Sequence, residues 1–181
     1  MAYLLRALLT FMLASILLTV MAAKHIYVLP FGHIQLAIPT FIFVIFIQAF
    51  VMFYFIGISR LVNNVHAILN GHGNLDELFE QAPEDLTPYL TKVEKYVFDS
   101  TLCKRQTIPW TMLMLVLGSA GFLLGGAHDT GMVSKVVHAG VIYGFLAAVV
   151  IGFVRQWIYL GKSHRLLREM KALFGIADAQ M

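Results

Sequence analysis

Four long apolar stretches place the strongest constraint on what this chain can fold into. A helix needs about 20 apolar residues to cross the roughly 30 Å hydrocarbon layer of a membrane, because each residue rises about 1.5 Å. Residues 3–23, 34–59, 107–127 and 136–160 meet this requirement. Only 13% of the 181 residues are charged, whereas about a quarter are charged in a soluble domain. The sequence therefore predicts an all-α integral membrane protein with four transmembrane helices in a four-helix bundle.

The first stretch has an alternative interpretation as a cleaved secretory signal. Arg6, the apolar run after it and the small pair Ala22-Ala23 resemble the three regions of such a signal. We favour a retained span.

Lysine and arginine positions predict the orientation, because positive residues that flank spans stay on the cytoplasmic side. If the stretches form two consecutive hairpins, only Lys24 and Lys135 face the outer side. We therefore expect both termini and the middle loop to be cytoplasmic, in a bacterial inner (plasma) membrane. This topology accounts for the basic residues, and no basic binding module indicates a nucleic-acid partner. The residues on the cytoplasmic side are Arg6, Arg60, Lys92, Lys95, Lys104, Arg105, Arg155, Lys162, Arg165, Arg168 and Lys171.

The chain divides into four predicted segments. They are a first transmembrane hairpin (1–60), a cytoplasmic amphipathic loop (61–106), a second transmembrane hairpin (107–161) and a cytoplasmic basic amphipathic tail (162–181). Apolar spacing predicts that the second span continues as a helix until Asn70-Gly71 stops it, and that residues 88–105 form a helix on the membrane surface or against a partner. Thr107-Ile108-Pro109 resembles an N-cap followed by a first-turn proline, and so predicts the start of the third span.

The two hairpins share a layout that is consistent with tandem duplication. A histidine ends one span, another opens the next, and Gly-x-Ser follows at 57–59 and at 161–163, with offsets of about 104 residues between the halves. Two hairpins that cross the same bilayer would also share span length, so both interpretations stay open.

Four histidines fall at the outer end of the predicted helices. They are His25, His33, His128 and His138, and Asp129 lies beside one of them. Neutral imidazole binds transition metals and haem iron, and bundles build such sites from facing helices. The cluster therefore predicts a transition-metal site or a b-type haem site, with a set of interfacial polar side chains that bind nothing as the alternative.

Two pairs of glycines predict close helix packing. Gly121 and Gly125 lie on one face of the third span, and Gly140 and Gly144 lie on one face of the fourth. His138 falls on nearly the opposite side from the second pair, so a haem between the two glycine faces would not meet it. Both pairs are interpreted as packing sites, within this chain or with another subunit.

Polar groups are rare inside the predicted spans. Gln48 lies near the middle of the second span and needs a hydrogen-bonding partner, which we expect on another helix. Phenylalanines at 43, 46, 50 and 53 form a stripe on the same span, typical of a face toward lipid or a neighbouring apolar surface. No acidic residue lies deep in any span, which argues against a proton relay.

No catalytic motif accompanies these features, and the one cysteine, Cys103, cannot form a disulfide within the chain. We expect no catalytic activity from the chain alone. The best-supported function is an accessory or anchor subunit of a larger membrane complex, respiratory or otherwise redox-active, which packs against other membrane subunits or a second copy. The alternatives are an electron-transfer subunit that binds metal or b-type haem, and a small oligomeric transporter.

Overall fold

The computed structural model describes residues 1–24, 26 and 33–176, and these residues are helical apart from short connections. Four helices are long and apolar enough to cross a membrane, and no strand occurs in the described ranges. The predicted all-α fold with four such helices is therefore confirmed. In chain order the elements are α1 (Ala2–Ala23), α2 (His33–Ala67), a π-helical turn η1 (Ile68–His72), a 3-10 turn η2 (Leu75–Glu77), α3 (Thr87–Asp129) and α4 (Lys135–Leu173).

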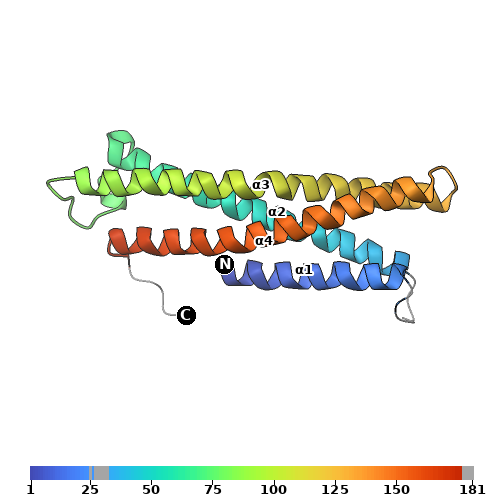
Figure 1. The fold of residues 1–181 in the computed structure, drawn as a ribbon. Coiled ribbons are helices and arrows are strands. Elements are labelled where there is room, and N and C mark those ends of the chain that lie inside the picture. Colours follow the sequence, from blue (N-terminus) through green and yellow to red (C-terminus); the bar gives the residue numbers. More distant parts are fainter. Residues whose placement is uncertain (25, 27–32, 177–181) are drawn as a thin grey trace.

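The helices differ in length, and this difference gives the bundle two parts (Figure 1). α1 has 22 residues, whereas α2, α3 and α4 have 35, 43 and 39. The three longer helices extend about 50–65 Å, roughly twice the hydrocarbon thickness of a membrane. They continue past the N-terminal end of α1 (Figure 1). The core of one part is formed by residues of all four helices, whereas the long helices that contribute to the core of the other part are α2, α3 and α4.

The three-helix part has a hydrophobic core of its own. Val62 and Val65 from α2 pack with Val93 from α3 and with Leu166 and Met170 from α4. These apolar faces cover one another within the chain, so the predicted helix at 88–105 has partners in α2 and α4. Burial between neighbouring helices removes the same apolar area from water that docking on headgroups would remove.

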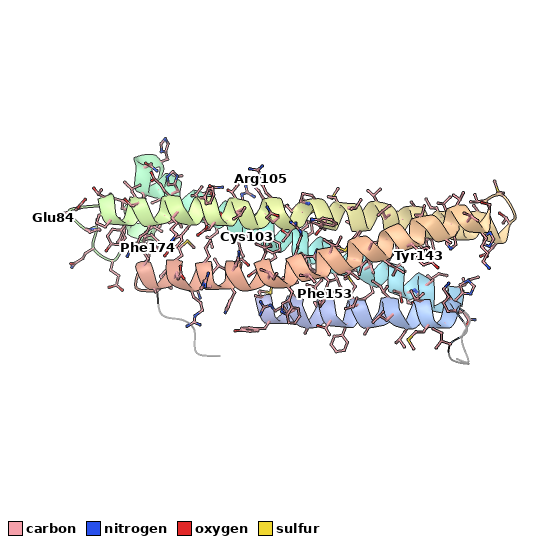
Figure 2. All side chains as sticks on the ribbon, in the orientation of Figure 1. Glu84, Cys103, Arg105, Tyr143, Phe153 and Phe174 are labelled. Carbon is pink, nitrogen blue, oxygen red and sulfur yellow. The ribbon has the colours of Figure 1, made fainter. Side chains whose placement is uncertain are left out.

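Aromatic rings close the far end of this three-helix part. Phe79, which follows η2, lies edge-on to Tyr89 and Phe174, with ring centroids 4.9 and 5.3 Å away. Phe174 lies at the end of the bundle that also holds Glu84 (Figure 2). As predicted, Asn70-Gly71 marks the end of the α2 extension, and Gly71 takes the left-handed backbone that glycine tolerates, with φ at 83°.

The predicted helix start at Thr107 is wrong. Thr107 lies inside α3, fully buried, and its hydroxyl donates backward to the carbonyl oxygen of Cys103 at 2.8 Å. A threonine hydroxyl can bond back to the preceding turn as readily as it caps the next one. Pro109 lies within the same helix, where packing against neighbouring helices tolerates the lost hydrogen bond. The predicted helix at 88–105 and the predicted third span are therefore one helix.

Arg6 joins α1 to α4. Its guanidinium donates to the carbonyl oxygen of Trp157 at 2.9 Å and lies 5.0 Å from the centre of the Trp157 ring. A Cβ on Gly161 would collide with this guanidinium. The absence of a side chain at Gly161 therefore lets Arg6, the one charged residue of α1, reach both the carbonyl oxygen and the ring face of Trp157 on α4.

The phenylalanine stripe on α2 faces outward. Phe46, Phe50 and Phe53 are exposed on the surface of the bundle, while Phe43 packs partly against the core. An outward position is that expected of side chains that contact lipid or a neighbouring apolar surface.

The predicted orientation can be tested with introduced thiols. Cys103 is buried and would resist labelling from either side, so it is replaced by serine. We expect Met132→Cys, in the exposed α3–α4 connection, to react with a membrane-impermeant maleimide on intact cells. Glu77→Cys, which is exposed at the other end, should react only after permeabilisation. The reverse labelling pattern would overturn the orientation.

Candidate functional site

The end of the bundle that holds the α3–α4 connection, here called the histidine end, brings most of the predicted site residues together. His33 opens α2, His128 lies in the last turn of α3 and His138 in the first turn of α4. All three line a single cavity with Asp129. His25 lies outside the described residues.

His128 and His138 form a parallel pair between α3 and α4. Their ring centroids are 6.0 Å apart and their planes differ by 12°. His128 Nδ1 lies 3.1 Å from the carbonyl oxygen of Val133, and because a carbonyl can only accept, the nitrogen is the donor in this contact. His138 Nδ1 is buried and has no partner among the described atoms. The pair therefore offers unused hydrogen-bonding or ligand capacity in a partly buried place.

Gly125 provides the space that the His138 ring occupies. A Cβ at this position would come within 3.3 Å of the ring carbon Cε1. The sequence placed His138 away from the glycine face of its own helix, and the structure places it against a glycine of the neighbouring helix.

Metal ligands are few in this arrangement. Within residues 1–24, 26 and 33–176, no group of three or more His, Cys, Asp or Glu side chains converges in a way that could hold a metal ion. A closed zinc site needs four ligands, whereas two axial histidines suffice for haem iron. The metal or haem assignment stays a prediction.

The cavity at the histidine end has a volume of about 770 Å³ and is lined by all four helices. Its charged residues are Lys24, Asp129 and Lys135. The Lys24 ammonium donates to the Tyr143 hydroxyl at 3.2 Å and so connects α1 to α4; Tyr143 lies toward this end in Figure 2. The volume falls within the range of about 300–1,000 Å³ that is usual for sites of small ligands.

The predicted glycine pairs have different surroundings. Gly121 is buried, and a Cβ there would lie 2.7 Å from Ile142 Cδ1, so it supports close packing of α3 on α4. Gly118, which the sequence reading did not single out, has a similar role against Phe145, at 3.1 Å. Gly140 has nothing within 4 Å, and Gly144 has only Leu117 Cδ1, at 3.9 Å. One pair thus packs inside the chain and the other is left on the surface.

Gln48 finds its partners on two other helices. Gln156 Nε2 donates to Gln48 Oε1 at 2.7 Å and to Thr111 Oγ1 at 2.9 Å. Gln48 Nε2 lies 3.3 Å from the sulfur of Met12. Gln48, Thr111 and Gln156 are fully buried, so this glutamine cluster joins all four helices at the centre of the bundle.

Sequence reasoning missed Gln156 and Thr111. A signal was present: Gln48 and Gln156 are uncharged polar residues at similar depth in spans that enter from the same side. The predicted tandem duplication stays a prediction, because the two Gly-x-Ser segments share some surroundings and differ in others. Ser59 and Ser163 of the two Gly-x-Ser segments are both buried, but Gly57 faces open space whereas Gly161 contacts Arg6.

Comparison with family models, with curated proteins and with solved structures finds no match to this chain.

The glutamine cluster can be tested with a double-mutant cycle. Gln156→Leu leaves Gln48 without its amide partner, and we expect a loss of about 1–2 kcal/mol in the free energy of unfolding in mixed micelles. The double variant Gln48→Leu/Gln156→Leu should lose less stability than the sum of the two single losses. Each single variant holds one unpaired amide, whereas the double variant holds none.

Gln81→Leu, at an exposed loop position, is the control and should leave stability within about 0.5 kcal/mol. Strict additivity of the two single changes would contradict the coupling.

Proposed function

We propose that this protein is an accessory or anchor subunit of a larger membrane complex, in a bacterial inner membrane with both termini in the cytoplasm. The proposal is carried by one observation, the exposed small-residue face of α4. Gly140, Gly144 and Ala147 follow one another at helical spacing and are all exposed. Small residues let two helix backbones approach closely in a membrane, where packing and not the hydrophobic effect drives association.

The contrast with α3 strengthens this interpretation. The glycines of α3 that have neighbours contact side chains of this chain, namely Ile142, Phe145 and His138. Gly140 has no such neighbour. An exposed glycine gains no packing from lipid and costs about 1 kcal/mol of helix propensity relative to alanine, whereas a partner helix would use the space it leaves.

The rest of the bundle suits a packing role. The glutamine cluster and the Arg6 contact with Trp157 both hold α4 against its neighbours. They fix the rotation of α4, and with it the direction in which the small-residue face points. A fixed face lowers the entropy that a partner helix must lose on docking.

A second candidate function, binding of a transition metal or a b-type haem, is favoured by the parallel pair His128 and His138 and by the unpartnered Nδ1 of His138. Two histidines match the axial ligand set of a haem better than the ligand set of zinc. Transport has less support, because the centre of the bundle is filled by the hydrogen-bonded side chains of Gln48, Thr111 and Gln156.

Substitution of the exposed glycines tests the subunit proposal. We expect Gly140→Leu/Gly144→Leu to remove the small-residue face and to lower co-purification with a partner about tenfold or more, in a mild detergent and read by native gels and mass spectrometry. Folding should be retained, because open space surrounds Gly140.

Gly57→Leu is the matched control, since Gly57 is an exposed glycine of α2 with nothing within 4 Å. The proposal is overturned if the double variant and the control migrate alike at the size of the wild-type assembly. A partner identical to this chain would identify a homo-oligomer.

The haem or metal candidate is tested on protein purified from its native membrane. An absorption spectrum and elemental analysis should show a Soret band, or a stoichiometric metal, that is lost when His25, His33, His128 and His138 are all replaced by alanine. An unchanged Soret band or metal content in the fourfold variant would contradict this candidate function.

A further inference from the structure

The cavity at the histidine end has the depth of one membrane leaflet. Its lining runs from His33 to Val44 on α2, from Gly118 to Asp129 on α3 and from Lys135 to Leu146 on α4. Each of these segments rises about 16 Å, which is half of the roughly 30 Å hydrocarbon layer. A molecule that fills the cavity would thus extend from the membrane surface to about the midplane.

The deep walls of the cavity are apolar. Phe41 and Phe122 stack there with ring centroids 4.8 Å apart, and Ile142 belongs to the same lining. The two threonine hydroxyls on the wall, Thr19 and Thr40, lie 3.0 Å apart and bond to each other. The Thr19 hydroxyl also donates to the carbonyl oxygen of Ser15 at 2.9 Å. Hydroxyls with such partners inside the protein leave a surface suited to a hydrocarbon chain.

The mouth of the cavity is polar and carries more positive than negative charge. Between Arg6 and Arg60 the only charged residue is Lys24, and between Arg105 and Arg155 the only ones are Asp129 and Lys135. These three residues all line the cavity. Charge in this half of the protein is therefore confined to the cavity, with two ammonium groups against one carboxylate.

A buried polar atom adds to this arrangement. His138 Nδ1 has no hydrogen-bonding partner among the described atoms, and its ring belongs to the cavity lining. A ligand oxygen would reach this closed-off nitrogen after a turn of the ring, whereas Lys24 and Lys135 are exposed and would form charge-assisted hydrogen bonds to an anionic group directly.

We propose that this cavity binds one hydrocarbon chain of an anionic amphiphile, with its phosphate or carboxylate held by Lys24 and Lys135 beside His138. The site is separate from the small-residue face of α4, and it does not depend on the subunit function. A phospholipid and a free fatty acid share this chemistry, and the experiment distinguishes them.

The test uses the purified full-length protein in a neutral detergent and native mass spectrometry. The probes are dioleoyl phosphatidylglycerol, dioleoyl phosphatidylcholine, oleate and a neutral decyl-benzoquinone. We expect an anionic probe to be retained about tenfold more than phosphatidylcholine. The anionic probes pair with the two lysines, whereas phosphatidylcholine carries a fixed positive charge that the lysines repel. Retention of phosphatidylglycerol indicates a membrane lipid, and retention of oleate alone indicates a free fatty acid.

Two test variants, each with a control, distinguish binding of the anionic headgroup from binding of the hydrocarbon chain. Lys24→Gln/Lys135→Gln, both at exposed positions, should lower anionic retention about tenfold, and Lys92→Gln/Lys95→Gln, two exposed lysines of α3 far from the cavity, should not. Ala37→Phe fills the cavity and should lower binding of every chain-bearing probe, whereas Ala7→Phe, on the exposed face of α1, should have no effect.

The proposal is overturned if neither phosphatidylglycerol nor oleate is retained more than phosphatidylcholine, and also if the neutral quinone is retained more strongly than both anionic probes. Unchanged anionic retention in the lysine variant would do the same. That variant keeps the test valid even if Ala37→Phe fails to fold, because its changes are at the surface.

Discussion

The hydrogen bonds among Gln48, Gln156 and Thr111 are the constraint on which the arrangement of this bundle depends. No water reaches the hydrocarbon layer, so a buried amide must find its partner on another helix. The cluster involves α2, α3 and α4 directly and α1 through the sulfur of Met12. A rotation of any one of these helices would break it. The same constraint therefore sets which faces meet and which remain outside, including the outward phenylalanines of α2 and the exposed glycines of α4.

Length and apolarity were enough to predict the four helices, because the bilayer allows few alternatives to a helix of about 20 residues. They were not enough to predict where helices continue beyond the membrane. Thr107 and Pro109 have the pattern of a helix start, yet α3 runs through them. Tertiary contacts keep the helix continuous here, because residues on both sides of Thr107 pack against α2 and α4. Local capping rules do not include such contacts.

The candidate site shows the same division. The positions of the span ends predicted four histidines and Asp129 at one end of the bundle. The three of these histidines that the structure describes do line one cavity with Asp129. It did not predict that His138 lies against Gly125, or that the two glycine pairs differ in their surroundings. These features depend on the rotation of α4 relative to α3, which is set by Gln156 in a distant part of the same helix. A single sequence identifies the polar residues but not their pairing across helices.

The continuity of α3 has a mechanical consequence. Its 43 residues form a stiff rod of about 65 Å that joins the wall of the cavity to the aromatic cluster around Phe79 and Tyr89 at the opposite end. A separate helix at 88–105 would have placed a hinge between these regions. A continuous rod turns a small tilt at one end into a larger lateral displacement at the other. The two ends of the bundle are thus coupled through the backbone of one helix, so a tilt of α3 at the cavity displaces the aromatic cluster at the opposite end.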